Sequence, residues 1–165
     1  MLRGKRVSTT LSEFLRKQAE SLEAEAQRNK PVIEKWQNAI RKLFGTVRKW
    51  IEASDPRNLI KINDRDEEMT EPGLGLYTVP RMDLTVFGRW IGMIPKARKT
   101  VGTLKLPHKS AAERASGRID ITDQIRRYVL YWFEESDTWM IDDLHSEPRP
   151  FTKEEFEAAL LSYLQ

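Results

Sequence analysis

The residues best suited to acid–base or metal chemistry in this chain are carboxylates. Asp142 and Asp143 adjoin one another after an apolar segment, and residues 63–68 contain a run of further acidic side chains. Paired carboxylates can act as general acid and base, and they also bind Mg²⁺ or Ca²⁺. Neighbouring residues on a strand point to opposite faces, which argues against one shared site for Asp142 and Asp143. The acidic run lacks the spacing and the glycine of an EF-hand loop, so we expect residues 64–71 to form a solvated loop.

Other catalytic residue types are scarce. The chain has no cysteine and only two histidines, His108 and His145, which excludes thiol chemistry and disfavours a histidine metal site. Ser110, His108 and Asp120 have the residue types of a hydrolase triad, but no nucleophile-elbow motif accompanies them. The sequence therefore predicts no catalytic residue, no metal site and no cofactor. A small enzyme that uses carboxylates stays as an alternative.

A basic segment, residues 96–118, is the strongest candidate for ligand binding. Its only acidic residue is Glu113, and its basic residues are Lys96, Arg98, Lys99, Lys105, Lys109, Arg114 and Arg118. Such a cluster can bind phosphates with release of counterions. The segment contains no aromatic side chain, so stacking on bases is not indicated. One hypothesis is therefore an accessory protein that contacts nucleic-acid phosphates; the alternatives are a solvated loop or an acidic protein partner.

The clearest structural pattern is a helical register near the start of the chain. Residues recur at alternating steps of four and three, and all but one are apolar: Leu15, Ala19, Leu22, Ala26, Asn29, Ile33, Trp36, Ile40, Leu43, Val47 and Trp50. This coiled-coil-like period predicts an amphipathic helix that packs lengthwise against a partner or a sheet. Thr10 and Glu13 match a capping box at its start, and Pro56 marks its end.

Pro31 leaves two possibilities for this helical region. A proline inside a helix removes a hydrogen bond and clashes with the preceding turn, whereas it is favourable in a first turn. The region is therefore either one kinked helix or two helices that break near Asn29. Because the register continues across Pro31, the sequence favours the kinked helix.

The two halves of the register differ in bulk, which suggests two different roles. Residues 32–51 carry large apolar side chains and are expected to pack on the chain's own sheet. Residues 10–29 are expected to project and to bind a partner protein or a second copy through Leu15, Ala19, Leu22, Ala26 and Asn29. This predicts a non-catalytic accessory subunit that acts by protein–protein interaction. Alternatively, the whole register packs within the chain, as in any amphipathic surface helix.

From residue 57 onward the pattern changes to strands. Alternation with a period of two, together with aromatic and β-branched runs, predicts an antiparallel sheet of about five strands. The clearest part is a hairpin of residues 128–133 and 138–141. Residues 82–94 are expected to form one strand with Gly88 as a bulge or bend.

A C-terminal helix is expected to pack on this sheet. Thr152 and Glu155 form a second capping box, and Phe151 and Phe156 have the spacing of a hydrophobic staple. The predicted fold class is therefore α+β, with helices covering an antiparallel sheet.

Length and composition indicate a folded protein, with 165 residues, of which 39% are hydrophobic and 32% charged. We expect residues 1–56 to be a helical extension, and residues 57–165 to be a sheet domain that includes the basic segment. No apolar run reaches the roughly 18 residues of a membrane span, and the first ten residues lack the apolar core of a signal peptide. The expected location is cytoplasmic, without a membrane partner.

Overall fold

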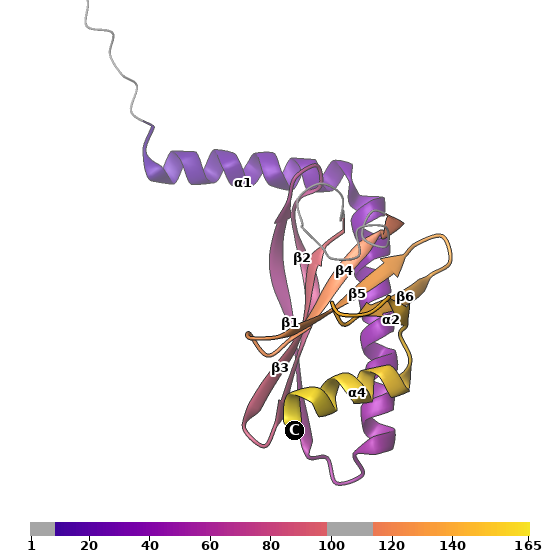
Figure 1. Ribbon diagram of the computed structural model, residues 1–165. Coiled ribbons are helices and arrows are strands. Elements are labelled where there is room, and N and C mark those ends of the chain that lie inside the picture. The colour runs from indigo at the N-terminus through magenta and orange to yellow at the C-terminus, as the bar shows by residue number, and fades with distance from the viewer. Residues whose placement is uncertain (1–8, 99–113) are drawn as a thin grey trace, which may run out of the picture.

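Seven strands and three helices make up the part of the chain that the computed structural model describes, residues 9–98 and 114–165. In chain order they are α1 (Leu11–Arg28), α2 (Lys30–Ser54), β1 (Ile60–Glu71), β2 (Gly75–Val86), β3 (Arg89–Ala97), β4 (Gly117–Thr122), β5 (Arg127–Phe133), β6 (Thr138–Asp142), β7 (Arg149–Pro150) and α4 (Lys153–Leu164). Each strand pairs antiparallel with the next along the chain, in a single sheet. Figure 1 shows α2 running along the sheet, α4 beside its lower end and α1 crossing its top. The predicted α+β class is confirmed.

Two separate helices occupy the N-terminal region, so the kinked-helix interpretation is wrong. α1 ends at Arg28 and α2 begins at Lys30, with Pro31 in the first turn, where its missing N–H costs no helical hydrogen bond. The side-chain amide of Asn29 donates to the carbonyl of Glu25 at 2.8 Å and so closes the end of α1. The chain turns sharply at this point (Figure 1), and the two helices therefore contact different parts of the molecule.

The sheet has seven strands rather than about five. Residues 64–71, expected to be a solvated loop, belong to β1 and pair along their whole length with β2. Residues 82–94 are two strands, because Phe87 and Gly88 both have positive φ and form a turn between β2 and β3. Gly88 is therefore part of a hairpin turn and not a bulge. Most charged side chains of β1 face solvent on a sheet edge. The sequence of this strand therefore resembles that of a solvated loop.

Both edges of the sheet carry features that oppose pairing with another strand. On β1 the exposed side chains include Asp64, Arg65, Asp66 and Glu68. At the other edge, β7 is only two residues long, and Pro150 lacks the amide hydrogen that a ladder requires. Charges, prolines and short edge strands are common means of avoiding edge-to-edge aggregation. Both edges are therefore poorly suited to pairing with a further strand.

The core lies between α2 and one face of the sheet, as predicted for residues 32–51. The Trp36 ring is fully buried and stacks on Trp132 at 5.7 Å and on Trp139 at 6.1 Å between ring centroids. Gly117 makes room for it, because a Cβ at this position would lie 2.4 Å from the indole. The buried side chains of α2 are Ile33, Trp36, Ala39, Ile40, Leu43, Phe44, Val47 and Ile51. Burying each large one stabilises the fold by about 1.5–3 kcal/mol.

The C-terminal helix has the predicted cap and staple. The hydroxyl of Thr152 accepts a hydrogen bond from the backbone N–H of Glu155 at 3.3 Å. The rings of Phe151 and Phe156 meet edge to face, with their centroids 6.2 Å apart. Trp50 of α2 contacts both rings, at 5.4 and 5.9 Å. The staple therefore also joins α4 to α2.

Candidate docking surface

The C-terminal half of α1 lies directly on the turn between β1 and β2. A Cβ atom at Gly75 would be 2.2 Å from the carbonyl oxygen of Leu22 and 2.6 Å from the backbone nitrogen of Ala26. Gly75 also has a φ of +94°, a conformation that side chains other than glycine rarely adopt. Only glycine therefore permits this close approach. The contact holds α1 in a fixed place relative to the sheet.

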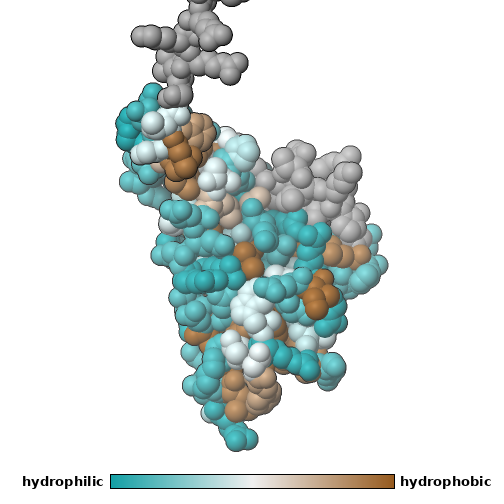
Figure 2. All heavy atoms as spheres, turned by 90° about the vertical axis from the view of Figure 1, so that its left-hand side faces the viewer, coloured by the Kyte–Doolittle hydropathy of each residue, from teal (hydrophilic) through white to brown (hydrophobic). Residues whose placement is uncertain are grey.

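The N-terminal half of α1 projects beyond this contact. Its first turn is capped by the hydroxyl of Thr10, which accepts from a backbone N–H at 3.2 Å. Leu11, Phe14 and Leu15 are 72%, 54% and 55% exposed, and at 3.6 residues per turn they lie on the same side of the helix as Leu22. We call these three side chains the free stripe. In Figure 2 apolar (brown) side chains gather on α1 above a mostly hydrophilic surface.

The structure divides the predicted partner-binding residues into two groups. Leu15 is exposed and belongs to the free stripe. The others are partly buried, namely Ala19, Leu22, Ala26 and Asn29. Sequence reasoning missed Leu11 and Phe14, although Leu11 extends the register by one step of four before Leu15. That step was the signal that could have found it.

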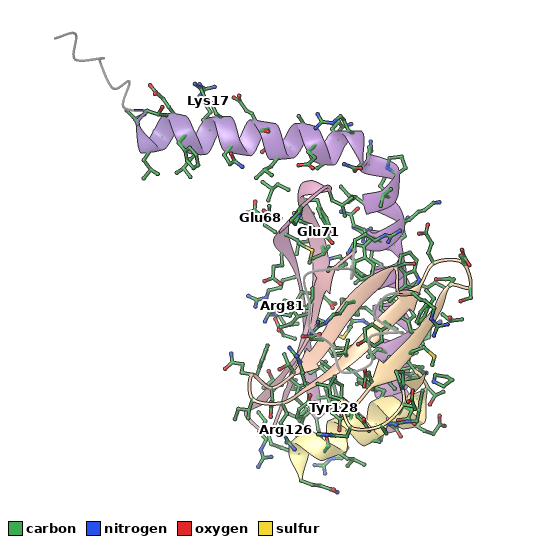
Figure 3. The ribbon with its side chains drawn as sticks, turned by 45° about the horizontal axis from the view of Figure 1, so that its top comes forward. Lys17, Glu68, Glu71, Arg81, Arg126 and Tyr128 are labelled. Atoms are coloured by element: carbon green, nitrogen blue, oxygen red, sulfur yellow. The ribbon has the colours of Figure 1, made fainter. Side chains whose placement is uncertain are left out.

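Beneath the free stripe, the edge strand β1 presents an acidic surface. Asp66 and Glu68 are exposed, and no ion pair to either is found in the described part of the chain. Figure 3 shows Glu68 on the side of the sheet that α1 crosses, and Lys17 on the side of α1 that points away. Glu71 is instead buried and accepts a hydrogen bond from the Tyr77 hydroxyl at 2.7 Å. The projecting helix thus places apolar side chains next to an acidic strand.

Two of the predicted phosphate-binding residues are engaged within the protein. The Arg98 guanidinium pairs with Glu134 and lies 5.5 Å from the centroid of the Trp132 ring. Arg118 is 2% exposed and forms two hydrogen bonds to the carboxylate of Asp120, at 2.7 and 3.0 Å. Both side chains are paired within the fold, because a buried arginine requires a carboxylate partner.

The remaining residues of that prediction have different outcomes. Lys96 is exposed at the end of β3, and Arg114 is exposed before β4. Three further residues lie outside the described part of the chain: Lys99, Lys105 and Lys109. The described residues of the basic segment therefore differ in exposure, and phosphate binding by this segment stays a prediction.

The adjacent carboxylates at the end of β6 do not share a site. Asp142 is fully buried and accepts from the backbone N–H of Leu144 at 2.8 Å. Burial by itself would raise the pKa of the Asp143 carboxyl. Hydrogen bonds from the backbone N–H groups of His145 and Ser146 outweigh this effect and hold the pKa below its usual range. Each carboxylate thus shapes the loop between β6 and β7.

Comparisons with known protein families, with curated proteins and with solved structures find no significant match to this chain. Within residues 9–98 and 114–165, no group of three or more His, Cys, Asp or Glu side chains is placed to hold a metal ion. No helix in these two ranges combines the length and apolar character needed to cross a membrane. The free stripe brings three exposed large apolar side chains together on one helix.

Proposed function

We propose that this chain is a non-catalytic interaction protein that docks through α1, and that its partner is a second copy of the same chain. The free stripe is the observation that supports this, because three large apolar side chains are exposed on a helix that Gly75 fixes to the sheet. Helices that dock on partners use apolar anchors at this i, i+3, i+4 spacing. A helix that is already positioned loses little conformational freedom on binding.

A second copy supplies an apolar complement to the free stripe. Two stripes that face each other antiparallel about a two-fold axis near Leu15 match each other, as a symmetric interface requires. The side of each α1 that carries Lys17 points away from the free stripe, so Lys17 stays exposed in this arrangement. Because both copies make the same contacts, the assembly closes as a dimer.

The expected dimer is weak. The free part of α1, residues 11–21, is roughly 16 Å long at about 1.5 Å per residue. Each buried apolar side chain contributes about 1.5–3 kcal/mol, while association costs about 4–15 kcal/mol. Six such side chains leave a surplus of a few kcal/mol, so we expect a dissociation constant of about 1 µM to 1 mM.

Sedimentation velocity over about 5–500 µM protein covers the useful part of this range. The test variants are Phe14→Ser and Leu15→Ser, which remove apolar surface without touching the contact at Gly75. Phe87→Ser is the matched control, because Phe87 is 81% exposed at the β2–β3 turn, away from α1. It removes a comparable apolar surface elsewhere on the molecule.

The proposal predicts that the wild-type protein and Phe87→Ser shift from monomer to dimer at the same concentration. Phe14→Ser and Leu15→Ser should each weaken the dimer by about tenfold or more, the equivalent of about 1.4 kcal/mol. A wild-type protein that stays monomeric up to the highest concentration would contradict self-association. Equal weakening by Phe87→Ser would place the interface elsewhere.

A further inference from the structure

The face of the sheet opposite α2 contains a cleft of about 970 Å³. In β3, Ile91 and Met93 point into the core, and the residues that alternate with them, among them Trp90 and Lys96, line the cleft. The turn between β4 and β5 and the start of β5 contribute further cations, Arg126 and Arg127. Figure 3 shows Arg126 close to α4, with Arg81 higher on the sheet.

An indole ring in this cleft is held in a defined orientation. The Nε1–H group of Trp90 donates to the carboxylate of Asp83 at 3.0 Å. A Cβ at Gly92 would lie 2.5 Å from the six-membered part of the indole, so glycine is required beneath it. The guanidinium of Arg81 lies 5.6 Å from the ring centroid and also pairs with Asp83, at 3.0 Å. Trp90 nevertheless stays partly exposed.

Besides Arg81, three cations line the cleft, and two of them have no acidic partner among the described residues. Lys96 and Arg127 are exposed, and neither pairs with an acid among residues 9–98 and 114–165. Arg126 donates to the carbonyl of Ser162 at 2.9 Å and lies 5.3 Å from the Tyr163 ring centroid, so its position is fixed although its side chain is 57% exposed. It also forms an ion pair with Asp123, at 3.9 Å.

The acids that line the cleft are neutralised by arginines outside it. The carboxylate of Asp120 is bonded to buried Arg118, and Asp143 pairs with Arg149 at 3.5 Å. The cleft therefore has a surplus of positive charge next to a preorganised aromatic ring. This combination is typical of surfaces that bind single-stranded nucleic acid, where cations follow the phosphates and bases stack on aromatic side chains.

We propose that this cleft binds single-stranded nucleic acid, with a phosphate group near Lys96, Arg126 and Arg127 and a base against the exposed surface of the Trp90–Arg81 pair. An acidic polypeptide would satisfy the cations but has no planar group for the indole. A duplex would present phosphates but would keep its bases stacked out of reach. A single strand offers both groups at once.

Fluorescence anisotropy with a fluorescein-labelled oligo(dT) strand and the full chain tests this proposal. Three phosphate contacts on a single strand predict a slope of log K against log salt of about −2, because each contributes about −0.7. The double variant Lys96→Gln with Arg127→Gln should reduce that slope by about 1.4. Trp90→Ala should weaken binding by roughly 5- to 150-fold and leave the slope unchanged.

Lys49→Gln is the matched control, since Lys49 is an exposed cation on α2, which covers the other face of the sheet; binding should not change. The proposal is wrong if oligo(dT) does not bind at low salt, or if the double variant binds as tightly as the wild type. Competition separates the ligand classes. Effective competition by poly-glutamate would assign the cleft to an acidic polypeptide, and competition by AMP as strong as that by the strand would assign it to a free nucleotide; both results would overturn the proposal.

Discussion

Replacing Gly75 with alanine measures how firmly α1 is seated on the sheet. The new Cβ would lie 2.2 Å from one backbone atom of α1 and 2.6 Å from another. Backbone atoms cannot rotate away as a side chain can, so α1 must lift off the turn between β1 and β2. Alanine at this positive φ costs about 1–2 kcal/mol, and the lost burial of Leu22 adds about 1 kcal/mol. A total of about 2–3 kcal/mol lowers the Tm of a chain of this size by roughly 4–12 °C.

Circular dichroism on heating measures that shift, and hydrogen exchange of the amides of residues 22–28 shows whether the helix has detached. Gly88→Ala is the control, because Gly88 has a φ of +80° but no atom within 4 Å of the Cβ position. Gly88→Ala therefore has the free-energy cost of alanine at a positive φ without a steric clash. We expect Gly75→Ala to show the larger fall in Tm and faster exchange in residues 22–28. Equal Tm values and equal exchange for the two variants would refute the seating of α1 on Gly75.

Three further predictions concern Trp36 in the core, the carboxylate of Asp83, and the stability of the fold at alkaline pH. Trp36→Ala removes a fully buried ring and should lower the free energy of unfolding in urea by about 3–5 kcal/mol. Asp83→Ala leaves two arginines and an indole N–H without their shared acceptor, which should cost about 3 kcal/mol in the same assay. Burial raises the pKa of the Tyr77, Tyr131 and Tyr163 phenols above the ordinary value of 10. Because the folded state then holds these protons more tightly, its stability should fall as the pH rises above 10, with most of the phenolate absorbance appearing together with unfolding.

The elements that could be predicted from the sequence are those specified by neighbouring residues. The caps at Thr10 and Thr152 depend on a hydroxyl that accepts from the backbone N–H three positions later, and both form. The core face of α2 follows from its own apolar period. The hairpin of β5 and β6 was recognisable because its strands are apolar and its turn polar. Each of these features is local and therefore visible in a single sequence.

The features that sequence reasoning missed depend on distant contacts. β1 resembles a loop because it is a charged edge strand, and its partner β2 supplies the pairing that makes it a strand. The direction of α1 depends on the contact of Leu22 and Ala26 with Gly75, which lies about fifty residues further along the chain. The sequence predicts that Arg98 can bind phosphates, whereas in the fold Arg98 pairs with Glu134, which is distant in the sequence. The sequence places Trp90 in a strand but does not show its position in the cleft with Lys96 and Arg127. That position follows from the register of β2, β3 and β4.

Disulfide trapping at Leu15 tests the proposed dimer most directly. The natural chain has no cysteine, so Leu15→Cys gives a single thiol near the expected two-fold axis, where it meets its own copy within reach of a disulfide. Lys17→Cys places the thiol on the opposite side of the same helix. Under mild oxidation we predict rapid formation of a covalent dimer by Leu15→Cys and slow formation by Lys17→Cys. Equal rates for the two variants would contradict docking through the free stripe.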